Sequence, residues 1–543
     1  MENANITHLP INRAMQSFLI NAGTAEEKIA MVQAALEGAE GGFWRKQLGE
    51  WAARAVPVEL LVPEAHREWR PLVHEAIAFV VKRLSPARLA PKIVEQLTLS
   101  PQRPAEDRLL RFIAKVPGLQ KIGQVLARNR SLHPRLRRAL VKLENGIADV
   151  SIGEVKSIIG RDLKAQIEAY EIKLASKILS EASVSAVLGF TWRNPATRRR
   201  ERGVFKVLKP HISSCYAEDM KILGQLTRHL ARRRHVTGAK LGSLVETLAE
   251  IRLLLEREVD FPREQTTLAT ALGEYRALPG ARVPELIPAL STATITALTL
   301  EMGKKVTAAR ALPANLRVNV AERLAKSLLA VPAFSRERDA IFHADPHAGN
   351  LLYDKRKDQL VILDWALTER LARKQRKNVV MLVLMMLLRD ADGMTKAIGE
   401  LCRTNTQDSA PGGNIRKHVE RLLDSLPLTR LPGPMQALRL LDNIALDGVR
   451  FPAALLMFRK AAFTLEGVVE DIAGTRVQLD SLVASHAAEN WKDTAVSLFR
   501  LLSPSDWVAL EWSALTFSSR VCARAIVYPW HWLAGLTANP ESA

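Results

Sequence analysis

The feature that most constrains this 543-residue chain is one short motif followed by a short apolar segment. Residues 343–350 have the pattern H-x-D-x-x-x-x-N, which places Asp345 and Asn350 on one tight loop. Asp364 ends the apolar run 360–363 shortly downstream. Asp and Asn beside Gly and Pro also form ordinary turns, but turn formation demands no such spacing.

This pattern is typical of phosphoryl transfer from ATP. The reaction needs a carboxylate that orients the acceptor, and an Asn and a second Asp that hold Mg²⁺ against the phosphates. Mg²⁺ keeps several waters, so two oxygen-bearing side chains and the phosphates suffice. The motif therefore predicts a kinase-like Mg-ATP site in which Asp345 orients the acceptor, or a water, and Asn350 and Asp364 bind the metal.

A cation for the α- and β-phosphates is predicted at Lys206. It lies in the β-rich segment 204–208, where it alternates with apolar neighbours. A lysine in this role is normally fixed by a glutamate on a helix, and Glu264 is the candidate. A solvent-facing strand lysine is the alternative, and the position of Lys206 upstream of the 343–350 loop favours the phosphate role.

Taken in this order, the motifs resemble the UbiB/AarF/ADCK family of atypical, protein-kinase-like kinases over roughly residues 105–400. Lys121 and Gln124 match the K-x-G-Q signature of that family, and Glu258 and Asp260 match its E-x-D motif. The segment 343–350 is similar to its catalytic loop.

The resemblance also implies two nucleotide-binding segments. The stretch 180–187 is similar to the alanine-rich nucleotide loop of the family and contains Ala182 and Ser183. The stretch 300–302, with Glu301, resembles the hinge that would hold adenine, although an ordinary strand end would look the same.

From the resemblance we expect an α+β, two-lobed protein-kinase-like fold that binds ATP and Mg²⁺. The K-x-G-Q helices would cover the place where a protein substrate otherwise docks, so a protein substrate is not expected. Lys121, Gln124, Glu258 and Asp260 would tune nucleotide selectivity. The family is associated with ATPase-like behaviour and with isoprenoid-quinone lipid metabolism.

Two departures from the family pattern leave turnover open. Glu181 replaces an alanine in the nucleotide loop, and a carboxylate near phosphates either points away or weakens binding. The D-F-G motif is Asp364-Trp365-Ala366, and the loss of glycine restricts the backbone there. The alternatives are a pseudokinase scaffold that binds nucleotide or lipid without turnover, and a small-molecule kinase of the aminoglycoside or choline type.

Composition bears on partners and location. The net charge is +20, which attracts anionic lipid, nucleic acid or acidic proteins. No nucleic-acid-binding motif is present, so an anionic membrane surface is the preferred partner. The N-terminus has no secretory signal pattern and no run is long and apolar enough to span a membrane. Three widely spaced cysteines form no metal or disulfide pattern. We expect a cytoplasmic protein, peripheral to the inner face of a membrane.

Hydrophobic periodicity and breakers divide the chain into five predicted parts. They are a helical N-terminal region of unknown role (1–103), a helical K-x-G-Q extension (104–180), an N-lobe (181–302), a C-lobe (303–480) and a C-terminal amphipathic, aromatic segment (481–543). Trp and Arg at 507–532 suit a membrane interface, while packing on the kinase body is the alternative. Pro529 is expected to end any single helix there.

Overall fold

The computed structural model describes residues 23–56, 58–62, 64, 67, 70–100, 102–127, 133–144, 149–237, 240–276, 278–402, 412–427 and 432–537. Contacts divide the chain into two compact units. Unit 1 comprises 1–266 and 285–300, and unit 2 comprises 267–284 and 301–543.

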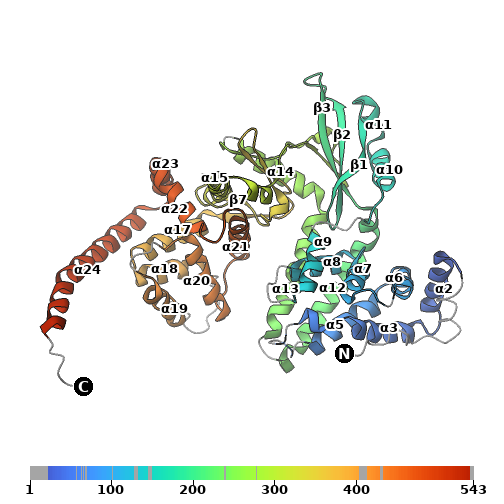
Figure 1. The fold of residues 1–543 in the computed structure, drawn as a ribbon, viewed down its shortest axis with the longest axis horizontal. Helices are drawn as coiled ribbons and strands as arrows, with labels where there is room; N and C mark the ends of the chain where they lie inside the picture. The colour runs from blue at the N-terminus through green and yellow to red at the C-terminus, as the bar shows by residue number, and fades with distance from the viewer. Residues whose placement is uncertain are drawn as a thin grey trace. The chain divides into compact units, whose positions relative to one another are not determined.

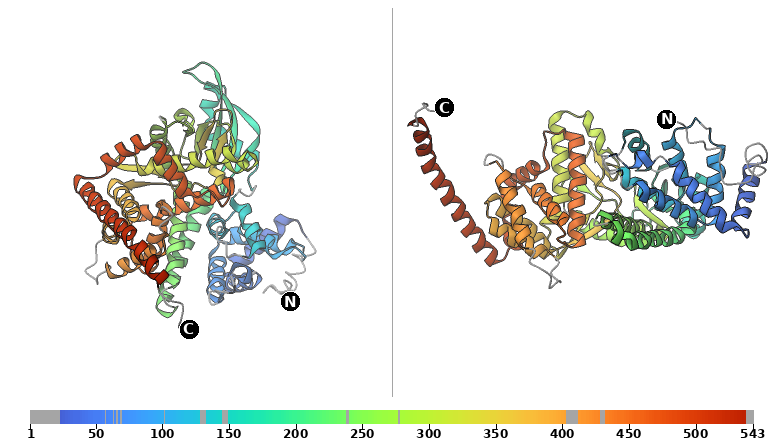
Figure 2. Two further views of the ribbon diagram at one scale, coloured as in Figure 1. Left: turned by 60° about the vertical axis from the view of Figure 1, so that its left-hand side comes forward. Right: turned by 90° about the horizontal axis from the view of Figure 1, so that it is seen from below.

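The first part of unit 1 is helical. It contains α2 (Ala25–Glu37), α3 (Gly41–Ala55), α4 (Val58–Leu61), α5 (Arg70–Arg83), α6 (Pro86–Thr98), α7 (Ala105–Ile113), α8 (Pro117–Ala127) and α9 (Pro134–Glu144). Thr24 starts α2 with a capping box to Glu27. Helices α2, α3, α5 and α6 share one apolar core with α12 (Pro210–Thr237) and α13 (Lys240–Val259), and α12 packs against α13 (Figures 1 and 2). The N-terminal helices are therefore part of the body of unit 1.

A four-stranded antiparallel sheet forms the second part of unit 1. Its order is β1 (Lys173–Glu181), β2 (Ser185–Arg193), β3 (Arg200–Leu208) and β5 (Ile295–Thr299). Helices α10 (Ile152–Asp162) and α11 (Lys164–Ala169) adjoin it (Figure 1), and the two rings of Phe190 and Phe205 stack in its core with centroids 3.9 Å apart. Helix α14 (Phe261–Tyr275) begins in unit 1 and ends in unit 2.

Residues 173–180 were expected to be helical, and this prediction is wrong because they form β1. Leu174 and Ile178 have the i, i+4 spacing of a helix face. The pairing of β1 with β2 is irregular between these two residues and again before Ser180. Irregular pairing of this kind removes the strict alternation by which a strand is recognised in a sequence.

Unit 2 holds two small sheets among helices. Strand β7 (Asp339–His343) pairs with β10 (Thr368–Ala372), and a second sheet has the order β4 (Ala281–Arg282), β9 (Gln359–Ile362), β8 (Leu351–Asp354), β6 (Lys304–Lys305). The larger helices are α15 (Ala314–Ala325), α17 (Arg373–Leu387), α18 (Ala391–Leu401), α19 (Gly412–Ser425), α20 (Pro434–Leu446), α21 (Ala453–Ala473), α22 (Leu479–Glu489) and α23 (Trp491–Leu501). Shorter turns of helix in unit 2 are η3 (Val306–Ala311), η4 (Lys326–Ala330), α16 (Val331–Ala333) and η5 (Ala348–Asn350). One further short turn, η2 (Pro288–Leu290), belongs to unit 1.

The last helix corrects one expectation. Helix α24 (Pro504–Thr537) runs through Pro529, which was expected to end it. A proline inside a helix removes one hydrogen bond and bends the axis without always ending the helix. The first turns of α24 contact α17 through the ion pair Lys377–Asp506. Among the residues that the structure describes, no helix is long and apolar enough to cross a bilayer.

Candidate nucleotide site

The loop that follows β7 carries the predicted catalytic residue Asp345, and His343 holds it in place. The His343 ring is buried; its Nδ1 accepts the Asp345 N–H at 3.2 Å, and its Nε2 lies 3.0 Å from the Leu363 carbonyl and 2.9 Å from the Asp364 carbonyl. These partners require a neutral imidazole with the proton on Nε2. Burial also lowers the pKa of His343. One ring thus joins the backbone of Asp345 to the backbone of Asp364.

Asn350 lies at the end of η5 and makes contacts to both segments. Its Nδ2 donates to the Asp345 carbonyl at 3.3 Å, and its own carbonyl accepts from Leu363 N–H at 2.8 Å. The Nδ2 contact fixes the orientation of the amide, so Oδ1 is the atom available to a metal. Asp345, Asn350 and Asp364 are therefore brought together within unit 2.

The D-W-A segment has a specific backbone geometry. Asp364 has a left-handed φ of +54°. Ala366 does not have a positive φ, since it is not among the non-glycine residues with positive φ in the described part of the chain. Trp365 is buried, donates from Nε1 to the Ile362 carbonyl at 3.1 Å, and packs edge-on against His343 and Tyr275. The backbone restriction expected from Ala366 therefore has no consequence in this conformation, because alanine adopts it freely.

In unit 1 the predicted phosphate lysine has its predicted partner. The Lys206 Nζ lies 2.6 Å from Glu264 Oε1, and the two side chains are 11% and 4% exposed. Lys206 is in β3 and Glu264 is in the first turn of α14. Asp260 accepts the Arg263 N–H at 3.1 Å, so it caps the helix that carries Glu264. The lysine is held in place on a strand of the sheet.

Lys121 of the K-x-G-Q signature and Glu258 of the E-x-D motif meet at the turn between β1 and β2. Lys121, on α8, forms a short ion pair with Glu258, and Ser183 donates to Glu258 Oε2 at 3.2 Å. Gln124 follows Lys121 by three residues on the same helix. The Ala182 N–H closes the turn by donating to the Ser185 carbonyl at 2.8 Å. This arrangement links the K-x-G-Q helix to the predicted nucleotide loop.

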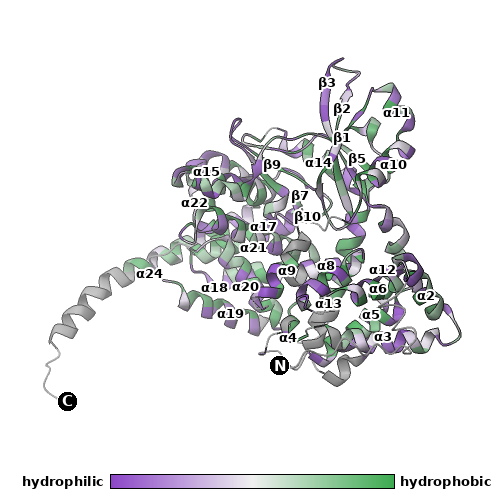
Figure 3. Ribbon diagram, turned by 45° about the vertical axis from the view of Figure 1, so that its right-hand side comes forward, coloured by the Kyte–Doolittle hydropathy of each residue, from purple (hydrophilic) through white to green (hydrophobic). Residues whose placement is uncertain are grey.

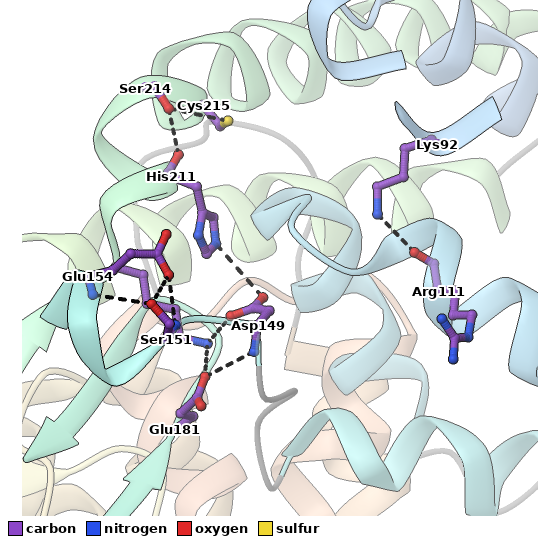
Figure 4. Close-up of polar contacts among 10 residues, drawn as sticks. Lys92, Arg111, Asp149, Ser151, Glu154, Glu181, His211, Ser214 and Cys215 are labelled. Carbon is purple, nitrogen blue, oxygen red and sulfur yellow. Dashed lines mark hydrogen bonds and ion pairs between the residues drawn. The ribbon is translucent and has the colours of Figure 1, made fainter. Parts of the chain in front are cut away.

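Glu181 turns toward a buried lysine. Its Oε2 lies 3.0 Å from Lys209 Nζ and accepts the Asp149 N–H at 3.2 Å (Figure 4). Of the two alternatives for this carboxylate, the structure favours the one in which it points away from the loop. The pairing of Lys209 with Glu181 and Asp149, like the bonds of the His343 ring to Leu363 and Asp364, was missed from the sequence. These contacts join segments far apart in the chain and follow no local pattern.

Glu301 forms an ion pair within unit 2. Its Oε2 lies 2.6 Å from Arg282 Nε, and Arg282 also contacts Asp354 at 3.0 Å. Arg282 donates in addition to the Met302 carbonyl at 3.1 Å. The side chain of Glu301 thus supports the 301–302 backbone, which is the part that a hinge would offer to adenine.

No cluster of three or more His, Cys, Asp or Glu side chains is arranged to hold a metal ion within the described ranges. Asp364 and Asn350 form a smaller donor set of a carboxylate and an amide oxygen. These hard oxygen ligands suit Mg²⁺ when phosphate and water complete the shell.

Comparison with known proteins adds to this geometry. Residues 142–398 match the ABC1 atypical kinase-like domain. This match and the names of the relatives confirm the resemblance to the UbiB/AarF/ADCK family of atypical kinases. The expected α+β, two-lobed kinase-like fold is confirmed with it.

The curated relatives are distant. A "Probable protein kinase UbiB" of Xylella fastidiosa is 27% identical over 299 residues, which are 53% of this chain and 52% of the relative. "Protein ACTIVITY OF BC1 COMPLEX KINASE 7, chloroplastic" of Arabidopsis thaliana is 24% identical over 65% of this chain and 50% of its own length. The chain thus spans about half the length of these relatives.

A solved structure, "The complex structure of Rv3197-erythromycin from Mycobacterium tuberculosis", aligns with a TM-score of 0.44 at 16% identity, over 67% of this chain and 89% of that one.

Proposed function

We propose that this protein is an atypical kinase-like enzyme that binds Mg-ATP and acts as an ATPase or phosphotransferase. The observation that carries the proposal is the His343 ring, which fixes Asp345 and Asp364 on adjoining segments that Asn350 also bridges. In the roles of this family, Asp345 would orient the acceptor hydroxyl or a water. Asn350 and Asp364 would hold Mg²⁺, which neutralises charge on the phosphates.

The residues of unit 1 have roles of their own in this proposal. Lys206, fixed by Glu264, would bind the α- and β-phosphates, and the turn at 182–184 would contact the nucleotide. Lys121, Gln124, Glu258 and Asp260 would tune nucleotide selectivity, and Glu301 would mark the adenine hinge. Because Glu181 is paired and Ala366 is unstrained, the two reasons for preferring a pseudokinase lose weight.

A thermal shift measurement tests nucleotide binding. Ligand that binds only the folded state raises the melting temperature with the logarithm of its concentration. We expect Mg-ATP and Mg-ADP to raise it in the wild type and in Asp493→Ala, an exposed control on α23, but not in Asp364→Ala. Absence of any shift at millimolar nucleotide would reject the proposed site.

Turnover needs a separate measurement, because binding alone also fits a pseudokinase. Asp345→Asn keeps the shape of the side chain and removes the charge that would orient the acceptor. We expect it to lower ATP hydrolysis by about 10²-fold or more while nucleotide binding persists. If the wild type binds Mg-ATP but hydrolyses none, with or without lipid vesicles, the scaffold alternative is correct.

We also propose that the protein is peripheral to the cytoplasmic face of a membrane and supports isoprenoid-quinone or other lipid metabolism. The quinone part rests on the family resemblance. The membrane part rests on α24, where Val508, Trp512 and Leu515 are 66%, 73% and 66% exposed. Their i, i+4, i+7 spacing puts them on one helix face, and Figure 3 shows the apolar colouring at the start of α24. The net charge of +20 favours an anionic surface.

Vesicle flotation tests this membrane contact. With vesicles of phosphatidylglycerol and phosphatidylcholine, we expect the double variant Trp512→Ala/Leu515→Ala to float less than the wild type. Leu446→Ala, which removes an apolar side chain on α20 that is 81% exposed, is the control and should float normally. Equal flotation of all three proteins would argue against the α24 face as the contact.

A further inference from the structure

The turn at 182–184 is held by charged groups on both sides. On one side, Ser183 bonds to Glu258, which pairs with Lys121. On the other, Glu181 pairs with Lys209, a residue to which the family pattern described above gives no role. All of these residues lie in unit 1.

The second set, Asp149, Glu181 and Lys209, is buried and closely connected. The Lys209 Nζ lies 2.5 Å from Asp149 Oδ1 and 3.0 Å from Glu181 Oε2, and the Asp149 N–H donates to the same Glu181 oxygen at 3.2 Å (Figure 4). The exposed fractions of the Lys209, Asp149 and Glu181 side chains are 1%, 3% and 11%. Ion pairs in such surroundings are screened little by water and hold their geometry.

Lys209 also holds the turn through its backbone. Its N–H donates to the Val184 carbonyl at 2.9 Å, and Glu181 is the last residue of β1, directly before the turn. Residues 180–187 contain no glycine. The conformation of the turn is therefore set by contacts at both of its ends.

We propose that Glu181, Lys209 and Asp149 are positioning residues that keep the 182–184 turn in the conformation that receives the nucleotide. The inference rests on the proposed nucleotide-binding function. A loop ordered before its ligand arrives loses less conformational entropy on binding, so pre-organisation raises affinity. Glu181 then contributes to nucleotide binding through the turn, in contrast to the repulsion that its charge suggested.

The test uses Glu181→Ala in the full chain. This variant leaves Lys209 paired with Asp149, so no buried charge loses its only opposite charge and folding should persist. The matched control is Glu201→Ala, since Glu201 holds the turn at the other end of β2 through Asn194 and Thr197. Glu181→Gln can still accept from the Asp149 N–H and serves as the conservative variant.

Two measurements are made on each protein. In hydrogen exchange without nucleotide, we expect the Ala182 and Lys209 amides to exchange at least tenfold faster in Glu181→Ala. In Mg-ATP titrations, we expect the dissociation constant to rise about tenfold, with Glu181→Gln restoring most of the affinity and Glu201→Ala unchanged. If the cluster only stabilised the fold, faster amide exchange in the turn would not be accompanied by a higher dissociation constant for Mg-ATP.

Two other outcomes would overturn the inference. Unchanged amide exchange would show that the cluster does not hold the turn. Faster exchange with unchanged affinity would show that the order of the turn does not matter for the nucleotide. If the wild type itself does not bind Mg-ATP, the proposed function is rejected, and this result does not depend on the variants.

Discussion

Ala366 stands two residues after the proposed metal ligand Asp364, and the two positions differ in backbone conformation. Asp364 has the left-handed φ, while Ala366 is buried and takes a conformation open to any residue. We expect Ala366→Gly to lower the free energy of unfolding by about 0.4–1 kcal/mol, because glycine gains freedom in the unfolded chain. Urea denaturation measures this. A gain in stability would mean that alanine strains the segment.

Single residues also show how far the sequence predicts the site. The loop of Asp345 and Asn350 is local, so its spacing alone indicated metal and acceptor roles. The pairing of Lys206 with Glu264 spans 58 positions and was expected only because a phosphate lysine requires a helix glutamate. No such chemical requirement pointed to Lys209 and Asp149, whose pairing depends on how the chain folds.

Among the elements, α6 contains a lysine whose charge opposes folding. Lys92 is buried, its Nζ donates to the Arg111 carbonyl at 2.9 Å, and burial lowers its pKa to about 8. Below pH 8 both folded and unfolded chains carry the proton, so the full desolvation cost is present. As the pH rises from 8 toward 10.5, the folded state releases the proton first and the cost disappears.

This titration predicts the behaviour of Lys92→Met. A pKa shift corresponds to about 1.4 kcal/mol per unit, so burying the charge of Lys92 lowers the free energy of unfolding at pH 7 by roughly 3 kcal/mol. The hydrogen bond to Arg111 that the variant loses contributes only about 1 kcal/mol. We expect the variant to be more stable than the wild type at pH 7, with the advantage shrinking toward pH 10. Urea denaturation at several pH values measures it, with the exposed Lys82→Met as control. If the difference in stability between Lys92→Met and the wild type did not change with pH, the lowered pKa of Lys92 would not be its cause.

The elements that the sequence predicted least well share a physical cause. Strand β1 was hidden because its irregular pairing with β2 interrupts the alternation of side chains. Helix α24 continues past Pro529, although proline is normally a reliable sign of a helix end. The long amphipathic helices and strand β3 followed their periodicity, because burial on one face fixes that pattern. Strand β9 was recognised instead as a short continuous apolar run, and consecutive residues of this strand are buried.

On the scale of the whole molecule, the described helices α2, α3, α5 and α6, all before residue 100, share an apolar core with α12 of the kinase-like domain. Ile222, Leu226 and Leu230, on α12, are at most 4% exposed and lie in the same cluster as residues of α2, α3, α5 and α6. Arg88 pairs with the buried Asp219 at 2.6 Å, and Asp219 accepts the Gly118 N–H at the start of α8. These contacts connect the region to the helix that carries Lys121.

Deletion of residues 1–103 tests this connection. Exposing three such side chains costs about 1.5–3 kcal/mol each, which is comparable with a total stability of about 5–15 kcal/mol. The deletion also removes Arg88 and leaves the Asp219 carboxylate without its cation. We expect the shortened chain to aggregate or to melt well below the full chain, with strong binding of a hydrophobic dye. A monomeric product with an unchanged melting temperature would show that the region is an independent domain, and that the position of α8 does not depend on it.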